Sequence, residues 1–309
     1  MKTKSIRAIL PLFLSLTVTV LLMACGSPPT TSPQSRSSST TVHVLSDGSG
    51  DYATLETAIE SIAPESTIIL DEGTFHLEEA LEIDKPLTLE GAGSNKTIVS
   101  GEGAVASFRY TGSGLLTIRD ITFSRVGDFA ASVMAVLGGE VNFSNCRFTG
   151  GASNEDNSSG GVGLAFTNDS TGVVQNCEFD ENSSFGIAVF GQADPELISN
   201  NIHDNGQAGI YISIKEAGGL VERNDLRNNG LAGRGSGTDI NVIGGFSPTL
   251  ASNTCSREGP TGFSSEDWSG IVIISTSGNI SEATSVEGNG CAILRCDATS
   301  GMLSMTCKN

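Results

Sequence analysis

Two neighbouring stretches, CEFDENSSFGIAV at residues 177–189 and NNIHDNGQAGIYI at residues 200–212, decide the fold. Each has a cysteine or small polar residue, an aromatic or aliphatic residue two places on, a polar loop and then a Gly-Ile strand. The pattern recurs along the second half of the chain at spacings of 25, 31, 23, 24 and 29 residues. These spacings separate the members of one column, namely Phe123, Phe148, Phe179, Ile202, Leu226 and Cys255. A period of this size predicts stacked units that share one continuous core.

The column two residues earlier contains cysteines and then asparagines. We expect Asn200, Asn224 and Asn253 to be structural, because stacked asparagines bond from coil to coil and tolerate the left-handed turn conformation. Cys146 and Cys177 fall in this column on neighbouring repeats. Stacked strands lie about 4.8 Å apart, which is within the range of a disulfide. The pattern leaves open whether these residues are bridged or are two buried thiols.

The N-terminus resembles a bacterial lipoprotein signal. Three basic residues precede an apolar stretch at 8–23, and Leu22-Met23-Ala24-Cys25 is similar to a lipobox, in which the cysteine is acylated. An ordinary signal peptide and a membrane helix are the alternatives, but the stretch is short for a membrane span. We therefore expect a signal peptide at 1–24, lipid attachment at Cys25 and a Ser/Thr/Pro-rich tether at 25–41.

Charge and composition limit the partners of this protein. The 309 residues carry a formal charge of −18, and removal of residues 1–24, which hold three basic residues and no acid, leaves −21. This charge argues against a nucleic-acid ligand. It leaves room for calcium, although we expect no cofactor and no metal site, since His43, His76 and His203 are isolated in sequence. With 38 glycines and one tryptophan, the composition is typical of a turn-rich β protein.

The first part of the folded chain carries a second signal. In VHVLSDGSGDYATLETAIESI at 42–62, a strand and a Gly-rich turn precede a short helix with Thr54 as its N-cap. Short strands then follow at 67–70, 75–77, 86–89 and 97–99. We expect residues 42–66 to form a cap that covers the open end of the coils at 67–309.

These residues resemble the opening of pectinesterases and other pectin lyase-like proteins. The matching segments are DGSGDY at 47–52, GTF at 73–75, IDKPLTLEG at 83–91 and TIVSG at 97–101, and the later repeats are similar to generic right-handed parallel β-helix repeats. The resemblance implies an all-β fold, a single-stranded right-handed parallel β-helix of about ten coils with a short capping helix. It also implies three strands per coil, with the substrate groove on the outer face of the first strand. Because such folds host many activities, function must be argued from the site.

The register of the repeats assigns an inside and an outside to the first strand. With Ile187, Ile210, Ile240 and Ile271 inside, alternation predicts an outward set. This set consists of Ala165, Thr167, Ala188, Phe190, Tyr211, Ser213, Asp239, Asn241 and Val272. The face is poor in acids and bases, and the motifs that carry catalysis in pectinesterases are absent. A catalytic group could be assembled only from Tyr211, Lys215, Asp239 and Arg257, and a scattered, solvated surface is the favoured interpretation.

Long loops at 149–161, 227–238 and 256–268 all precede this strand, as insertions on a binding side do. Aromatic and amide side chains suit sugar binding, so we expect ligand contacts from Tyr211, Asn241, Phe263 and Trp268. Trp268 folded back over the edge of the stack is an alternative. Six cysteines other than Cys25 occur, and those at 255, 291, 296 and 307 are expected to form one or two bridges in the last coil.

The sequence thus predicts an extracytoplasmic, lipid-anchored β-helix on the bacterial cell membrane or outer membrane. We expect it to be a non-catalytic monomer that binds a polysaccharide or another surface partner and contacts the membrane through its lipid alone. A polysaccharide-active enzyme with a divergent site, such as an esterase, lyase or epimerase, is the first alternative. A structural spacer is the second.

Overall fold

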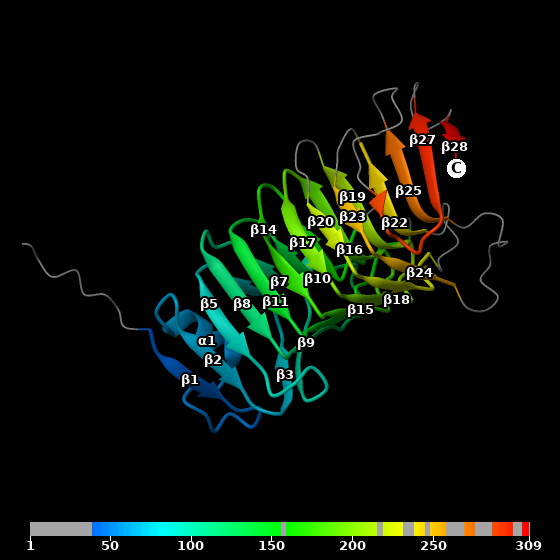
Figure 1. Ribbon diagram of the computed structural model, residues 1–309. Helices are drawn as coiled ribbons and strands as arrows, with labels where there is room; N and C mark the ends of the chain where they lie inside the picture. The colour runs from blue at the N-terminus through cyan, green and yellow to red at the C-terminus, as the bar shows by residue number, and fades with distance from the viewer. Residues whose placement is uncertain are drawn as a thin grey trace, which may run out of the picture. The chain divides into compact units, whose positions relative to one another are not determined.

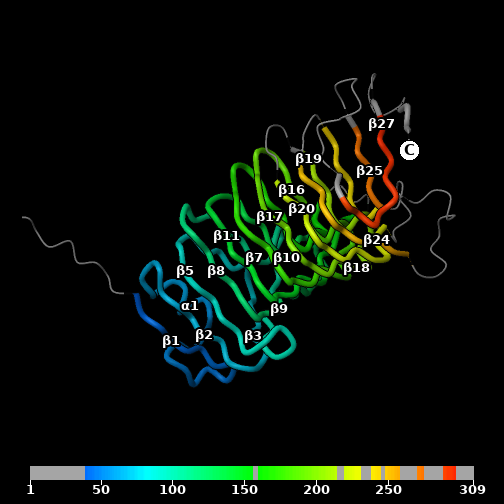
Figure 2. The backbone as a smooth tube through the Cα atoms, viewed as in Figure 1, coloured from blue at the N-terminus to red at the C-terminus, as the bar shows by residue number. Residues whose placement is uncertain are grey.

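A computed structural model describes residues 39–155, 159–214, 219–230, 238–244, 248–257, 269–275, 286–298 and 305–308. Within the unit Ser37–Asn309, the chain winds through successive coils, so that strands far apart in sequence lie side by side (Figure 1). The same winding is clear from the backbone alone (Figure 2). The all-β, right-handed parallel β-helix expected from the repeats is confirmed.

Each coil contributes one strand to each of three sheets. Sheet A contains β1 (Thr41–Val44), β2 (Thr67–Leu70), β5 (Leu87–Glu90), β8 (Leu115–Arg119), β11 (Glu140–Ser144), β14 (Thr171–Gln175), β17 (Asp194–Ile198), β20 (Leu220–Glu222), β23 (Thr249–Ala251) and β26 (Val286–Glu287). Sheet B contains β3 (Gly73–Leu77), β6 (Thr97–Gly101), β9 (Thr122–Arg125), β12 (Arg147–Thr149), β15 (Glu178–Asp180), β18 (Asn201–His203), β21 (Asp225–Arg227) and β24 (Thr254–Ser256). Sheet C contains β4 (Leu81–Ile83), β7 (Ala106–Tyr110), β10 (Ser132–Val136), β13 (Leu164–Phe166), β16 (Phe185–Gly191), β19 (Ala208–Ile214), β22 (Thr238–Ile243), β25 (Ser269–Ser275), β27 (Ile293–Ala298) and β28 (Met305–Lys308).

The repeat column read from the sequence is a column of the structure. Phe123, Phe148 and Phe179 are register partners on β9, β12 and β15, and all three are fully buried. Their rings stack, with centroids 5.6 and 5.0 Å apart. Each coil therefore buries its apolar side chain against the same side chain of the next coil, which is what makes the core continuous.

The helix α1 (Leu55–Ser61) begins where the sequence predicts. Thr54 and Thr57 form a reciprocal capping box, which satisfies the first backbone N–H groups of the helix. Lys85 Nζ donates to the carbonyls of Glu60 and Ile62 at the other end of the helix. The segment 42–66 contributes more than a cover, because β1 pairs with β2 and extends sheet A.

The asparagine column forms a ladder at the corner between sheets A and B. Asn200 Nδ2 donates to Asn224 Oδ1, and Asn224 Nδ2 donates to Asn253 Oδ1, at 3.0 and 2.9 Å. The structural role expected of these asparagines is confirmed, although the left-handed conformation that they tolerate is not found at the asparagines themselves. Positive φ falls on the preceding residues, such as Ser199 and Arg223, because those side chains point to solvent while each asparagine turns inward to the ladder.

The C-terminal end departs from the parallel pattern. β28 pairs with β27 antiparallel, so the last strand lies along the edge of the final parallel strand. Cys255 and Cys291 form a disulfide with Cα atoms 4.9 Å apart, and Cys296 is also disulfide-bonded. Cys146 and Cys177 are buried free thiols. No helix among the described residues is long and apolar enough to cross a membrane.

Candidate functional site

The outer face of sheet C follows the predicted register. Ile187, Ile210, Ile240 and Ile271 are partners and are buried in the core. The outward column runs through Ala188, Tyr211, Asn241 and Val272. Two of its members are nevertheless buried, since Ala188 is 0% and Val272 3% exposed. The accessible part of this column is therefore centred on Tyr211 and Asn241, which are both half-buried.

An aromatic cluster borders this position. The Tyr211 ring stacks on Phe185 with centroids 4.5 Å apart and lies 5.8 Å from Phe190. Phe185 and Phe190 pack over Ala165 and Ala188, which explains why these outward alanines are buried. The sequence analysis placed Phe190 on this face but missed Phe185. Phe185 lies one residue before the predicted Gly-Ile strand, so the inward–outward alternation of that strand did not include it.

Asp239 does not point outward, which corrects the prediction. On the preceding coils, the position of Asp239 is occupied by the glycine of the Gly-Ile strand, such as Gly209. These glycines lie against a second asparagine ladder, since a Cβ on Gly209 would lie 2.9 Å from Asn229 Nδ2. In this ladder Asn182 Nδ2 donates to Asn205 Oδ1, and Asn205 Nδ2 donates to Asn229 Oδ1. Asn229 Nδ2 then donates to Asp239 Oδ1 at 2.7 Å. The carboxyl of Asp239 thus ends the ladder and is 0% exposed.

The surroundings of Asp239 change its acidity. Burial raises its pKa to about 7, against the opposing effects of the hydrogen bonds from Asn229 and the charge of Arg257. Burial also lowers the pKa of Arg257, and the charge of Asp239 opposes that change. The sequence analysis named Asp239 and Arg257 among the residues from which a catalytic group could be assembled. The two residues do interact electrostatically, but the carboxyl of Asp239 is buried and does not lie on the outer face.

Buried side-chain oxygens of β22 lack hydrogen-bond partners among the described residues. Within the described part of the chain, nothing donates to Asp239 Oδ2 or to Asn241 Oδ1, and both atoms are buried. Buried polar atoms are normally satisfied, so an unsatisfied group calls for an explanation such as a bound ligand or water. Tyr211 is the register partner of Asn241, which places this amide next to the aromatic cluster.

Other predicted site residues cannot be placed. Lys215, Phe263 and Trp268 lie outside the described residues, as does Cys25. The three long loops do lead into one sheet, because the strands that follow them are β13, β22 and β25 of sheet C.

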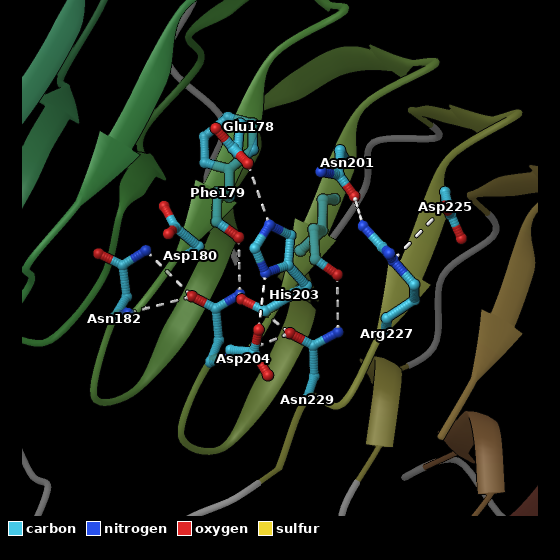
Figure 3. A network of polar contacts seen from close by, with 12 residues as sticks. Glu178, Phe179, Asp180, Asn182, Asn201, His203, Asp204, Asp225, Arg227 and Asn229 are labelled. Atoms are coloured by element: carbon cyan, nitrogen blue, oxygen red, sulfur yellow. Dashed lines mark hydrogen bonds and ion pairs between the residues drawn. The ribbon is translucent and has the colours of Figure 1, made fainter. Parts of the chain in front are cut away.

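Sequence reasoning missed a charged cluster on the outer face of sheet B (Figure 3). Arg147 donates from Nε and Nη2 to the two carboxylate oxygens of Asp180, at 2.8 and 2.5 Å. His203 lies between two carboxylates, with Nε2 3.1 Å from Glu178 and Nδ1 2.8 Å from Asp204. These side chains come from neighbouring coils, so a histidine that is isolated in sequence is surrounded by acids in space.

Electrostatics differ between the two faces. Burial lowers the pKa of His203, but hydrogen bonds to Asp204 and Glu178 and the charge of Asp180 outweigh it, so the pKa is raised. The charged side chains of the cluster around His203 bind one another, whereas the amide oxygen of Asn241 on sheet C has no hydrogen-bond partner among the described residues. We therefore place the candidate binding site at Tyr211 and Asn241. Among the described residues, no group of three or more His, Cys, Asp or Glu side chains is arranged to hold a metal ion.

The second ladder did have a signal in the sequence. Asn182, Asn205 and Asn229 each stand three places after a member of the apolar repeat column. Positive φ again falls on the residue before each asparagine, namely Glu181, Asp204 and Asn228. The two corners of sheet B therefore share one arrangement, in which a residue with positive φ precedes a ladder asparagine. The column was overlooked because loops of varying length follow it.

Comparison with known proteins agrees with this architecture. The model of the right handed beta helix region matches residues 93–255, which is more than half of the chain. The chain therefore belongs to this family. A search of curated proteins finds no match.

Solved structures extend the likeness to the N-terminal coils. Pectate lyase Pel9A is 14% identical with a TM-score of 0.54, covering 83% of this chain and 82% of its own. Pectin methylesterase from carrot is 15% identical with a TM-score of 0.50, covering 85% and 84%. A pectin methylesterase mutant in complex with a hexasaccharide is 12% identical with a TM-score of 0.50, covering 79% and 92%. At these identities the likeness establishes the pectin lyase-like fold alone.

Proposed function

We propose that this protein binds an extended polysaccharide along the outer face of sheet C without cleaving it. The observation that carries the proposal is the half-buried Asn241 beside Tyr211, whose amide oxygen has no hydrogen-bond partner in the described part of the chain. An amide next to aromatic side chains suits a sugar, because hydroxyl groups donate to the amide while the apolar face of a sugar ring packs against the aromatic edge.

The absence of cleavage is part of the proposal. Glycoside hydrolysis requires two carboxyl groups about 5–10 Å apart. Among the described residues of sheet C whose side chains point outward, Glu82 on β4 is the one carboxylate. It lies six coils from Asn241 and is paired with Arg109 at 3.0 Å. Asp239 is buried and bonded to Asn229, so it serves the ladder rather than a substrate.

The N-terminal segment and the cysteines support a proposal for the setting of the protein. Disulfides fit an extracytoplasmic location. We propose that a lipid on Cys25 holds the chain at the bacterial cell membrane or outer membrane through the tether at 25–41. The partner is then a polysaccharide or another cell-surface molecule, the protein acts as a monomer, and neither nucleic acid nor a metal cofactor takes part.

A glycan array tests the binding. We expect the intact protein to bind at least one extended glycan, and Tyr211→Ala and Asn241→Ala to weaken that binding about tenfold or more, since each removes a group at the centre of the site. Asn142→Ala is the matched control, because Asn142 is half-buried on the outer face of sheet A. A Trp268→Ala variant tests the predicted aromatic contact from the last long loop.

The contrary outcome is equally clear. Absence of any bound glycan, or unchanged binding by both Tyr211→Ala and Asn241→Ala, would remove the proposal and leave the structural spacer. The enzyme alternative has one observation in its favour, the carboxyl of Asp239 with a pKa of about 7 beside Arg257. Release of products from a polyuronate by the intact protein, lost in Asp239→Asn, would establish that alternative instead.

A further inference from the structure

Cys146 and Cys177 are the two free thiols among the described residues and occupy one corner on neighbouring coils. They are 2% and 1% exposed. The backbone N–H of Cys146 donates to Cys177 Sγ at 3.4 Å. The Cys177 sulfur atom therefore lies against the backbone of Cys146 on the neighbouring coil.

The column explains why these two residues stand together. On the next coil the backbone N–H of Cys177 donates to Asn200 Oδ1 at 2.9 Å, so the pair continues the first asparagine ladder toward the N-terminus. Sulfur is a weaker acceptor than an amide oxygen. Cysteine is thus a poor substitute for asparagine if the position serves only to satisfy backbone groups, and the presence of two adjacent cysteines calls for another reason.

The same chain bridges two neighbouring coils elsewhere. Thr254 pairs with Gly290 on the next coil, and the following residues, Cys255 and Cys291, form a disulfide with Cα atoms 4.9 Å apart. Cys146 and Cys177 immediately precede the register partners Arg147 and Glu178. Strands paired in this way lie about 4.8 Å apart, so a bond between the two sulfur atoms requires rotation of side chains and no movement of the backbone.

We propose that Cys146 and Cys177 form a disulfide between coils when the chain folds under oxidising conditions. The reaction joins the two sulfur atoms and releases two protons and two electrons. A disulfide oxidant such as oxidised glutathione accepts the electrons and is reduced to two thiols. The product closes a loop across sheets B, C and A that contains β12, β13 and β14.

Burial fixes when the bond forms. Desolvation raises the pKa of the Cys177 thiol well above its usual value, and exchange needs an accessible thiolate. Oxidation therefore takes place before the coils stack. A chain folded in reductant keeps its dithiol, and a chain folded in an oxidising compartment keeps its disulfide.

Peptide mapping of the full chain tests this inference. The protein is unfolded in denaturant with reductant and refolded either in reductant or in a mixture of reduced and oxidised glutathione. From the glutathione mixture we expect a Cys146–Cys177 linked peptide, about 2 Da lighter than the sum of its parts because two hydrogens are lost. The Cys255→Ser/Cys291→Ser variant is the matched control and should retain this link.

The proposal would be overturned by complete alkylation of Cys146 and Cys177 after oxidative refolding, in a sample that does contain the linked Cys255–Cys291 peptide. Oxidation of the reductively folded protein by glutathione within minutes would retain the disulfide and overturn its formation before the coils stack, because the buried pair should resist oxidation for hours. Both readouts use the wild-type chain, so they do not depend on whether a serine variant folds.

Discussion

Asp239 shows how a single residue can look functional in sequence and serve the fold. It interrupts a column of glycines, and its carboxyl takes the place that the next ladder asparagine would occupy. An amide would satisfy Asn229 equally well without a charge. The carboxyl therefore costs stability whenever it is ionised, since a buried charge loses its hydration.

Asp239→Asn should remove a pH dependence. The pKa of Asp239 is about 7 in the folded protein and 3.8 as the reference value, so between these values the folded state holds a proton that the unfolded state has released. The free energy of unfolding then falls as pH rises from about 4 to 7, by about 4 kcal/mol in the limit. Urea unfolding at pH 4.5 and pH 8 should show the variant to be more stable than wild type at pH 8 and similar to it at pH 4.5.

Asp84→Asn is the control for this comparison, because it makes the same chemical change at an exposed position. Its stability should follow that of the wild type at both pH values. An Asp239→Asn variant that is less stable than wild type at pH 8 would show that the interaction of the carboxylate with Arg257 exceeds the cost of burial.

Asn205 carries the second ladder, and its truncation should be costly. Its side chain is 0% exposed and donates to the Phe179 carbonyl and to Asn229 Oδ1. Asn205→Ala removes the donor to the Phe179 carbonyl and the acceptor of the Asn182 backbone and side-chain N–H groups, and we expect a loss of about 3 kcal/mol in the free energy of unfolding. Asn201→Ala, on the surface of sheet B, should lose less than about 1 kcal/mol. Equal losses in urea titrations would contradict a structural ladder.

At the scale of the element, the charges of sheet B alternate across its strands. Arg147 on β12 meets Glu178 and Asp180 on β15, and His203 on β18 meets Glu178 from the other side. Opposite charges on adjacent strands stabilise the pairing of those strands. The cluster thus acts as a set of cross-strand contacts, and its exposed members contribute modestly.

His203→Gln should reveal the sign of this effect. The pKa of His203 is raised in the folded state above its usual value of 6.5. Its protonated form therefore contributes stability that is fully present below pH 6.5 and is lost as pH rises through the folded pKa. Relative to wild type, the variant should lose on the order of 1 kcal/mol at pH 5.5 and less at pH 9, as measured by urea unfolding. A larger loss at pH 9 would contradict the assignment of charge.

The elements differ in how well the sequence predicts them. The strands of the Gly-Ile repeat and the N-cap of α1 follow from periodicity and capping chemistry, because those signals are local. β4 (Leu81–Ile83) was not expected, although strands of the same length were predicted at 75–77 and 97–99.

The charged cluster of sheet B was missed because its members are far apart in sequence. Its members on neighbouring coils pair across 25 to 33 residues of sequence, and only the register brings them together. The inward turn of Asp239 likewise depends on the neighbouring coil.

At the scale of the molecule, each coil touches only the coils before and after it. Stability in such a stack is close to a sum of coil and interface contributions, so one end can open while the rest stays folded. The C-terminal coils have the Cys255–Cys291 bond between them. The N-terminal end instead has α1, whose buried residues Leu55, Ala58 and Ile59 join the core.

Removal of that bond should therefore loosen one end selectively. In Cys255→Ser/Cys291→Ser, which leaves the disulfide of Cys296 in place, we expect amide hydrogen exchange to accelerate about tenfold or more in β22, β25 and β27. That change corresponds to about 1.4 kcal/mol or more of local opening free energy, within the range expected for loss of a bond that closes a loop. Exchange in β5, β8 and β11 should stay unchanged, because no contact joins these strands to the bridge. Uniform acceleration across all coils would mean that the stack unfolds as one cooperative unit, and the disulfide would then stabilise the whole β-helix rather than its end.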